Sequence, residues 1–361
     1  STMPVMDSTP SQTSVYSTGK AGYSTIAKKP QHFLSTADFT AEQLYELVRR
    51  AINFKVEAKY ETSKTPERPL TGKTLALIFS KRSTRTRVAT ESSMAYLGGH
   101  AMFLGGQDIQ LGVNESLLDT SRVVSSMVDG IMARVNGHEE IELLAQESTV
   151  PIINALSAKY HPTQILADLM TLHEHVHHRK SGAKDQYTAH LQHPRETLPG
   201  LRVAWVGDAN NILQEILVAF PKLGISVASA CPKGYTCDED VLAIAKADAK
   251  KSGAELLFTT DPLEAVKNAD VIITDTWISM GQEDEKAQRL REFEGYQVTM
   301  EMANKAGAKP DWSFMHCLPR KQEEVDDEVF YSERSLVFPE AENRKWTILS
   351  VIDTFMVKGG F

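Results

Sequence analysis

The chain has 361 residues, of which 42% are hydrophobic and 24% charged, and its formal net charge is −8 at pH 7. This length exceeds what one hydrophobic core usually organises, so we expect two domains. The acidic balance, with 39 Lys and Arg against 47 Asp and Glu, gives no indication of a nucleic-acid partner. The apolar runs are too short to span a membrane. Three cysteines, Cys231, Cys237 and Cys317, show no framework spacing, which suits a reducing compartment.

The first 32 residues differ in composition from the rest of the chain. They are rich in Ser and Thr, contain few large apolar side chains and show no periodicity, so we expect them to be disordered. Asp7 is their only acidic residue, which is typical of what remains of an organelle transit segment, although no arginine precedes Arg49. We therefore expect a mitochondrial matrix location, with the cytoplasm as the alternative.

Helix and strand patterns alternate between residues 33 and 160. Thr40 is a good N-cap for a predicted helix over residues 41–60. Helical spacing also predicts helices at 88–97 and 117–128. Short apolar runs predict strands at 75–79, 101–104, 128–133 and 150–155. This alternation indicates an α/β domain with a parallel sheet.

A basic octet, Ser80 to Arg87, follows the first of these strands and precedes a helix. Such a strand-to-helix turn directs unpaired N–H groups and the positive end of the helix dipole at one spot, which favours an anion. Its hydroxyls and guanidinium groups match phosphate or carboxylate oxygens. It is not a Walker loop, because the glycine-rich signature is absent. A solvated basic loop or a nucleic-acid patch is the alternative, and the acidic net charge disfavours the latter.

Further polar residues are expected to extend this anion site. Arg134 ends an apolar strand, on the edge where α/β sheets collect ligands. His161 precedes Pro162, which opens a long helix that reaches about His177, and Gln164 follows three residues after His161. We expect Arg134 to face the pocket of the octet, and His161 and Gln164 to project from one helix end. A lone Arg or His is more often structural, and that alternative stays open.

The end of that helix is rich in histidine. His173 and His177 have metal-ligand spacing, but no Cys or carboxylate cluster completes a site. We predict no metal here and interpret these histidines, with Arg179 and Lys180, as cations that complement the helix C-terminus. Residues 181–199 follow as a polar loop, so the helix over 161–180 is predicted to link two domains.

The second domain opens with a predicted strand at 201–207 and a helix at 212–223. Further strands are predicted at 225–230, 255–258, 271–275 and 312–315. A dinucleotide site would need Gly-x-Gly-x-x-Gly after the first strand, but positions 209 and 212 are Ala and Ile, so the cofactor interpretation fails. Asn210 and Asn211 remain as polar groups at that strand end.

Candidate binding residues also follow two more predicted strands in this domain. Asp275 stands beside a Ser279-Met280-Gly281 loop, and a carboxylate there suits a cationic amine. Cys317, flanked by His316 and Arg320, is a candidate ligand contact. A helix cap at Asp275 and an inert buried thiol are the alternatives. Residues 283–289 are predicted to form a solvated helix, and an amphipathic helix to about Met356 is expected to pack on the first domain.

Four motifs in register resemble those of the aspartate/ornithine carbamoyltransferase family, and they match its ornithine enzymes best. They are Ser83-Thr84-Arg85-Thr86-Arg87, His161-Pro162-x-Gln164, Asp275-x-Trp277-x-Ser279-Met280-Gly281 and His316-Cys317-Leu318-Pro319-Arg320. The resemblance implies transfer of the carbamoyl group of carbamoyl phosphate to the δ-amine of L-ornithine, which gives L-citrulline and phosphate. It implies no metal and no cofactor, and a homotrimer as the assembly.

The resemblance also implies roles for individual residues. Carbamoyl phosphate would be bound by Ser83, Thr84, Arg85, Thr86, Arg134, His161, Gln164, Cys317, Leu318 and Arg344. Ornithine would be bound by Asn211, Asp275, Ser279 and Met280. The residues expected to act in catalysis are Arg85, Arg134, His161, Asp275 and Cys317, the last two helping the δ-nitrogen to reach its uncharged state.

The expected fold is α/β, with two doubly wound parallel-sheet domains joined by long interdomain helices. A carbamoyl-phosphate domain is predicted at 33–160, completed by a C-terminal helix at 341–361, and an ornithine domain at 181–340. Residues 154–159 and the apparent insertion at 181–199 depart from the family pattern outside the matched contacts. The alternatives are another carbamoyltransferase, acting on putrescine, an acylated ornithine or aspartate, and a non-catalytic anion-binding homologue.

Overall fold

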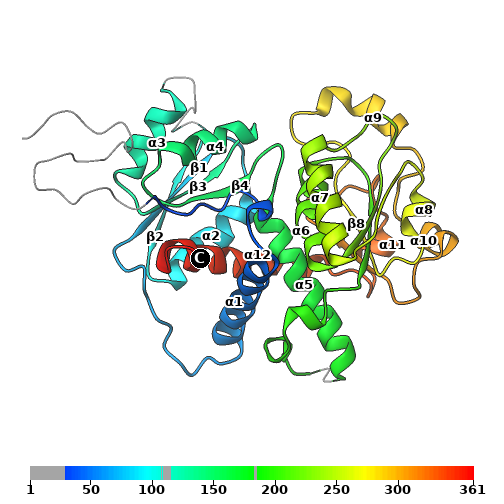
Figure 1. Ribbon diagram of the computed structural model, residues 1–361, viewed down its shortest axis with the longest axis horizontal. Helices are drawn as coiled ribbons and strands as arrows, with labels where there is room; N and C mark the ends of the chain where they lie inside the picture. The colour runs from blue at the N-terminus through cyan, green and yellow to red at the C-terminus, as the bar shows by residue number, and fades with distance from the viewer. Residues whose placement is uncertain (1–28, 107, 109–114, 183–184) are drawn as a thin grey trace, which may run out of the picture. The chain divides into compact units, whose positions relative to one another are not determined.

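The computed structural model describes residues 29–106, 108, 115–182 and 185–361. Their contacts divide the chain into two compact units, which Figure 1 shows from one side. Among the described residues, unit 1 comprises residues 29–34, 66–158 and 351–361, and unit 2 comprises residues 35–65 and 159–350. The segment predicted to be disordered lies outside the described residues, apart from residues 29–32. No helix in the described ranges is long and apolar enough to cross a membrane.

Unit 1 is built on a parallel sheet of four strands. The strands are β1 (Thr74–Phe79), β2 (His100–Leu104), β3 (Gly130–Arg134) and β4 (Ile152–Leu156), in the order β2-β1-β3-β4. The helices between them are α2 (Thr84–Tyr96), α3 (Leu117–Ser125) and α4 (His138–Glu147). Figure 1 shows α3 and α4 on one face of the sheet and α2 on the other. The strands β1, β3 and β4 are buried because they are almost entirely apolar and both faces of the sheet are covered.

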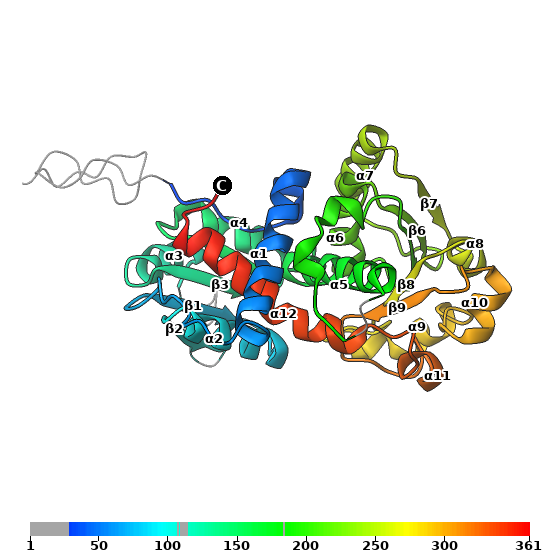
Figure 2. The ribbon, with the colours of Figure 1, turned by 90° about the horizontal axis from the view of Figure 1, so that it is seen from below.

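Unit 2 contains a parallel sheet of five strands. These are β5 (Arg202–Val206), β6 (Ser226–Ala230), β7 (Leu256–Thr259), β8 (Val271–Thr274) and β9 (Ser313–His316), in the order β7-β6-β5-β8-β9. The helices of this sheet are α6 (Asn211–Ala219), α7 (Glu239–Ser252), α8 (Pro262–Val266), α9 (Lys286–Glu292), α10 (Met300–Ala306) and α11 (Asp327–Phe330). Figures 1 and 2 show α6 and α7 on one face and α8 and α10 on the other. The predicted fold class, with two doubly wound parallel-sheet units, is confirmed.

Three longer helices complete the chain: α1 (Ala41–Lys59), α5 (Pro162–Ser181) and α12 (Val337–Ile352). Within unit 2, Nζ of Lys55 on α1 donates to Glu174 Oε2 on α5 at 2.7 Å and to Asn343 Oδ1 on α12 at 2.9 Å. These buried bonds explain why the contacts group residues 35–65 with unit 2, whereas the sequence pattern placed them in the first domain. The predicted domain boundaries stay a prediction.

The histidines at the end of α5 have a different role from the predicted one. His173 Nε2 donates to the carbonyl of Ala189 at 2.8 Å, and its Nδ1 lies 2.6 Å from Thr197 Oγ1. His177 is bonded through both ring nitrogens to Gln192 and Thr188. Burial lowers the pKa of His173, so it is not the predicted cation at a helix end. These rings instead fasten residues 188–197, which contain two short 3-10 turns, onto α5.

Both sheets have a point where the order of the strands reverses direction. In unit 1 it lies between β1 and β3, and in unit 2 between β5 and β8. In open parallel sheets, ligands bind outside the carboxyl ends of the strands at such points. The basic octet and Arg134 follow β1 and end β3, while Asn210 and Asp275 follow β5 and β8. The topology therefore places these polar residues where ligands bind in such sheets.

Candidate active site

The basic turn of unit 1 is the N-terminus of α2. Ser83 is the N-cap, and its side chain accepts a hydrogen bond from the N–H of Thr86. The remaining N–H groups of a first helical turn have no partner inside the helix, and this turn contains no acidic residue. Thr84 and Arg85 are exposed at the helix end, while Thr86 is buried. The turn therefore has backbone and guanidinium donors that suit an anion, and the binding of one there stays a prediction.

Arg134 lies beside this turn because β3 pairs with β1. Phe79 and Arg134 are opposite each other in the parallel register, and the N–H of Ser80 donates to the carbonyl of Arg134 at 2.9 Å. Burial, and then the positive charge of Arg85, lower the pKa of Arg134. Its Nε is buried without a hydrogen-bond partner among the described residues. The charge of Arg85 thus acts on Arg134, and no carboxylate in the described ranges offsets it, which is an arrangement that an anion would stabilise.

Arg87, the last residue of the octet, is engaged elsewhere. Its Nε donates to Glu91 Oε2 at 3.1 Å, and its guanidinium lies 3.9 Å from the centre of the Phe103 ring. This exposed ion pair one helical turn along α2 explains why Arg87 does not join Arg85 and Arg134.

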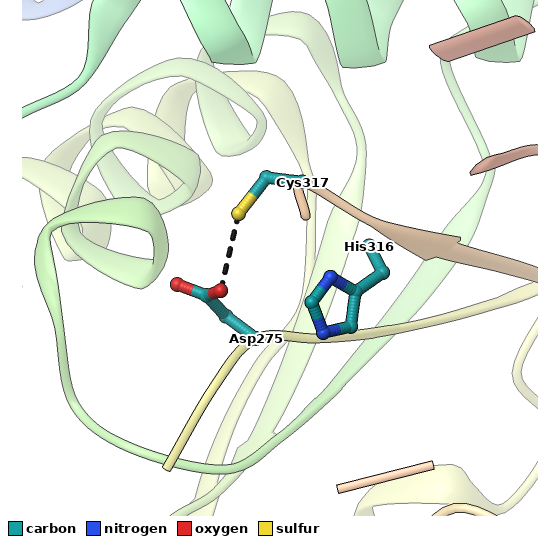
Figure 3. A group of neighbouring side chains, drawn as sticks. All are labelled: Asp275, His316 and Cys317. Atoms are coloured by element: carbon teal, nitrogen blue, oxygen red, sulfur yellow. Dashed lines mark hydrogen bonds between the residues drawn. The ribbon is translucent and has the colours of Figure 1, made fainter. Parts of the chain in front are cut away.

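The acidic site of unit 2 is centred on Asp275, which follows β8. Cys317 Sγ donates to Asp275 Oδ1 at 3.1 Å, and Asn210 Nδ2 donates to Asp275 Oδ2 at 2.9 Å. Asn210 also caps α6, because its Oδ1 accepts from the N–H groups of Ile212 and Leu213. One carboxylate is therefore held by donors from the ends of β5 and β9, as Figure 3 shows for the thiol.

The Cys317 side chain is a thiol in this arrangement. Burial raises its pKa well above the ordinary range, and the charge of Asp275 and the hydrogen bond to it raise it further. A thiol that donates to a carboxylate orients that carboxylate, whereas the thiolate would be the nucleophile or metal ligand. The structure thus supports Cys317 as a hydrogen-bond donor beside Asp275.

Asp275, His316 and Cys317 also bring three potential metal-ligand atoms within 4.8 Å of one another. The lone pair of His316 Nδ1 accepts the N–H of Leu318 at 2.8 Å, which leaves Nε2 to donate to Glu324 Oε1 at 3.1 Å. Both ring nitrogens are therefore engaged, and Figure 3 shows no hydrogen bond from the ring to the other two residues. We assign no metal to this group, since an imidazole needs a free lone pair to bind one.

A second polar cluster lies at the start of α5. His161 is buried and takes the N-cap position, with Pro162 as the first helical residue. Gln164 Oε1 accepts from Arg344 Nη1 at 3.1 Å, so two predicted ligands are in direct contact. Gln164 Nε2 donates to Asp168 Oδ1 at 3.0 Å and to Glu340 Oε2 at 3.3 Å. Asp168 and Glu340 were not predicted, and no motif marks them. The spacing of four residues between Gln164 and Asp168, which puts both on one helix face, could have predicted their contact.

The loop after Asp275 contains the remaining predicted ornithine ligands. Ser279 is half-buried, and its N–H donates to Gln282 Oε1 at 3.0 Å. Met280 is 58% exposed, and Gly281 has a φ of +93°, which a glycine adopts without strain. The structure does not bring Ser279 or Met280 into a described contact with Asp275.

The same loop is tied to the sheet by a buried ion pair that the sequence did not reveal. Arg289 Nη1 donates to Asp208 Oδ2 at 3.1 Å and to the carbonyl of Trp277 at 2.9 Å. The prediction of a fully solvated helix at 283–289 is therefore wrong for Arg289, which is 8% exposed. A buried arginine is tolerated here because Asp208 and the carbonyl supply its acceptors.

Two more predicted residues stand at a helix start and at a turn. Asn211 is the first residue of α6, next to the Asn210 that contacts Asp275. Leu318 has a φ of +66° and precedes Pro319 through a cis peptide bond. Its N–H is the donor to the His316 ring.

Two family models match successive parts of the chain. The carbamoyl-phosphate binding domain of aspartate/ornithine carbamoyltransferases matches residues 31–174. The aspartate/ornithine binding domain matches residues 199–355. Together with the two parallel sheets and their strand-end sites, these matches define the class as a carbamoyltransferase.

The chain belongs to the aspartate/ornithine carbamoyltransferase family. It is 52% identical over 337 residues to the mitochondrial ornithine carbamoyltransferase of Coccidioides immitis, covering 92% of this chain and 94% of that protein. It is 48% identical over 327 residues to the mitochondrial ornithine transcarbamylase of Gallus gallus, covering 91% and 86%.

Solved structures of such proteins share the fold. A crystal structure of a mitochondrial ornithine carbamoyltransferase from Coccidioides immitis has a TM-score of 0.81 at 48% identity, and the match covers 92% of this chain and 99% of that one. The ornithine carbamoyltransferase of Pyrococcus furiosus has the same TM-score at 43% identity, with coverage of 92% and 98%. The predicted resemblance to this family is confirmed.

Proposed function

We propose that this protein is an ornithine carbamoyltransferase, which transfers the carbamoyl group of carbamoyl phosphate to the δ-amine of L-ornithine and releases L-citrulline and phosphate. The relatives at 48–52% identity carry this activity in their names. In the structure, the strongest support for this proposal is the Arg85–Arg134 pair. These guanidinium groups lie at the switch point of a parallel sheet, beside a helix N-terminus without acidic residues.

The donor would be held at this switch point. Phosphate oxygens suit the N–H groups and hydroxyls of Ser83, Thr84 and Thr86 together with the guanidinium of Arg85. Attack on the carbonyl builds negative charge on its oxygen, and preorganised donors stabilise such charge strongly. Arg134 and His161 have the chemistry for that role. From unit 2, we further propose Gln164, Cys317, Leu318 and Arg344 as ligands of the carbamoyl group.

The acceptor would be held at the acidic site of unit 2. A single carboxylate, fixed by Asn210 and Cys317, matches the ammonium group of an amino acid that is cationic at neutral pH. Asp275 would orient the amine and, with the Cys317 thiol, favour its uncharged form. Asn211, Ser279 and Met280 are proposed as further ornithine ligands. An aspartate enzyme would want cationic groups where Asp275 and Met280 stand, so the structure favours a cationic acceptor.

A panel of acceptors tests this proposal. The purified protein is given carbamoyl phosphate with L-ornithine, putrescine, N-acetylornithine or L-aspartate, and each carbamoylated product is quantified. We expect citrulline formation to exceed the other products by at least about 100-fold in kcat/KM. Aspartate lacks a side-chain ammonium group, putrescine lacks the carboxylate and N-acetylornithine lacks the α-ammonium group, so each would leave groups of the site unpaired. Preference for another acceptor would assign a different carbamoyltransferase. Binding of carbamoyl phosphate without any product would indicate a non-catalytic anion-binding homologue.

The assembly and location are also proposed. We infer a homotrimer, as the resemblance to the family implied, and light scattering of the purified protein tests it by mass. We infer a mitochondrial matrix location because several relatives are named as mitochondrial proteins. Cell fractionation followed by immunoblotting tests that inference, and recovery in the cytosolic fraction would reject it.

A further inference from the structure

Two buried carboxyl groups lie behind the residues that contact substrate in the proposed function. Asp168 on α5 and Glu340 on α12 are each 1% exposed. Both accept a hydrogen bond from the same atom, Nε2 of Gln164, at 3.0 Å and 3.3 Å. Glu340 Oε1 also accepts the backbone N–H of His316 at 2.9 Å. The pair therefore touches the amide of Gln164 and the backbone immediately before Cys317.

The charges around this pair do not suit two carboxylates. Arg344 is the cation that acts on Asp168, and it approaches through the Oε1 side of Gln164. The NH2 group of Gln164 and the N–H of His316 also favour a negative charge on the pair, whereas Asp275 and the Cys317 thiol do not. Two like charges within hydrogen-bond reach and away from water are strongly unfavourable, so one of them is neutralised by a proton.

The hydrogen-bond geometry indicates which group holds that proton. Glu340 Oε1 is committed to the His316 N–H, whereas its Oε2 has only the longer bond to Gln164. Asp168 Oδ2 is buried and receives no hydrogen bond from an N–H or hydroxyl donor of the described residues. The Glu340 carboxyl lies close enough to donate one to Asp168 when it is protonated. Burial, then the charge of Asp168 and the hydrogen bond to it, raise the pKa of Glu340 well above the ordinary range. Burial raises the pKa of Asp168 to about 6.

We propose that Glu340 and Asp168 form a carboxyl pair that holds one proton on Glu340 and positions Gln164 and the His316–Cys317 backbone for the carbamoyl donor. The single negative charge of the pair offsets the positive charge of Arg344. The shared contacts fix the amide of Gln164 so that its oxygen faces Arg344 and its NH2 group faces the carboxyl pair. Both are positioning residues, and neither contacts substrate in this scheme. The inference rests on the proposed function for its kinetic consequence, while the location of the proton is independent of it.

Three variants separate the proton from the shape of the side chain. Glu340→Gln keeps two contacts of a protonated Glu340, because its amide oxygen accepts the His316 N–H and its NH2 group donates to Asp168. It loses only the 3.3 Å bond that Oε2 accepts from Gln164. Glu340→Ala removes both contacts, and Asp168→Asn removes the acceptor. We expect Glu340→Gln to keep kcat and the KM for carbamoyl phosphate within about threefold. Each of the other two should lose about 10- to 100-fold in kcat/KM, as expected when a group that supports binding residues is lost.

The pH profile gives a readout that a purely structural role would not move. As the pH rises, ionisation of Glu340 in the wild type should lower kcat/KM for carbamoyl phosphate, and Glu340→Gln should not show that decline. Equal losses in Glu340→Gln and Glu340→Ala, with both variants folded by circular dichroism, would overturn the proposal. So would identical pH profiles of Glu340→Gln and the wild type.

Infrared spectroscopy in D2O at neutral pH tests the proton without any turnover. We expect a C=O stretching band of a protonated carboxyl group in the wild type that is missing from Glu340→Gln. Glu61→Gln, which removes an exposed carboxyl group, serves as the control and should leave that band in place. If Glu340→Gln keeps the band, the assignment of the proton to Glu340 is overturned, even if the wild type forms citrulline. If Glu340→Gln loses the band but the wild type forms no citrulline, only the proposed function is rejected.

Discussion

The thiol of Cys317 donates a 3.1 Å hydrogen bond to Oδ1 of Asp275, which connects residues that follow two neighbouring parallel strands, β9 and β8. The other oxygen of Asp275 is held by Asn210, which follows β5. Because three strand ends converge on one carboxylate, its orientation is fixed by rigid elements. The first predictions concern this carboxylate and its donors.

Replacing Cys317 separates its hydrogen bond from its sulfur chemistry. Cys317→Ser keeps a donor to Asp275, so we expect kcat/KM for ornithine to fall less than about fivefold. Cys317→Ala removes it and should cost about 10- to 150-fold, since a hydrogen bond to a charged group contributes about 1.5–3 kcal/mol. Initial rates at varied ornithine measure both, with Cys231→Ala, a different buried thiol, as the control. A serine variant as impaired as the alanine variant would assign Cys317 a role that requires sulfur.

Asp275 should affect one substrate far more than the other. Asp275→Ala removes the carboxylate proposed to face the amine, so the KM for ornithine should rise at least about 100-fold, consistent with the loss of a charge-assisted contact. The KM for carbamoyl phosphate should change less than about threefold. Asp311→Ala, an exposed carboxylate of unit 2, is the control. Equal effects on both substrates would contradict the assignment of Asp275 to ornithine.

Replacing the arginine pair of unit 1, Arg85 and Arg134, should affect the use of carbamoyl phosphate rather than that of ornithine. Arg85→Ala should abolish turnover while leaving the fold intact, and Arg134→Ala should lower kcat by about 100-fold or more, as for other lost transition-state donors. Each variant also relieves the repulsion between the two guanidinium groups, so the thermal stability of the ligand-free protein should not fall. Calorimetry with and without carbamoyl phosphate measures this, because the donor should stabilise the wild type more than either variant. Near-normal citrulline formation by Arg85→Ala would reject the anion site.

The sequence predicted this site where the chemistry is local to a strand end. Ser83, Arg85, Asp275 and Cys317 each stand within a few residues of an apolar strand, and parallel pairing within each sheet brings neighbouring strand ends together. Asp168, Glu340 and Asp208 could not be predicted in the same way. Their contacts join helices and loops far apart in the chain, and an acidic residue in a helix normally indicates a solvated face. The same rule made the solvated interpretation of Arg289 wrong.

Glu215 should make the stability of unit 2 depend on pH. This buried carboxyl group accepts hydrogen bonds from Ser35 Oγ and the Thr36 N–H, both at 3.0 Å, yet burial raises its pKa from 4.5 to about 7. A folded-state pKa above the unfolded value gives stability that is present below about pH 4.5 and lost as the pH rises through about 7.

Glu215→Gln should therefore remove that dependence. The shift corresponds to about 3 kcal/mol, so the wild type should lose about that much relative to Glu215→Gln between about pH 4.5 and about pH 8. Chemical denaturation followed by tryptophan fluorescence at both pH values measures the difference, and Glu61→Gln, at an exposed position, controls for the loss of a charge. A constant difference between wild type and Glu215→Gln at all pH values would refute the prediction.

His173 should stabilise the segment that follows α5 without affecting catalysis. His173→Ala leaves the Ala189 carbonyl and the Thr197 hydroxyl without their partner and opens a cavity, so we expect a loss of about 2–4 kcal/mol. Since burial lowers the pKa of His173, its folded-state pKa lies below the unfolded value of 6.5, and its contribution is lost as the pH falls below about 6.5.

Limited proteolysis should cut residues 188–197 faster in the variant and, at mildly acidic pH, faster in the wild type as well. Leu191→Ala, a 73% exposed position in the same segment, should leave the cleavage rate unchanged, and KM values should be unaltered in both. A cleavage rate in His173→Ala equal to that of the wild type would show that the segment is held by other contacts.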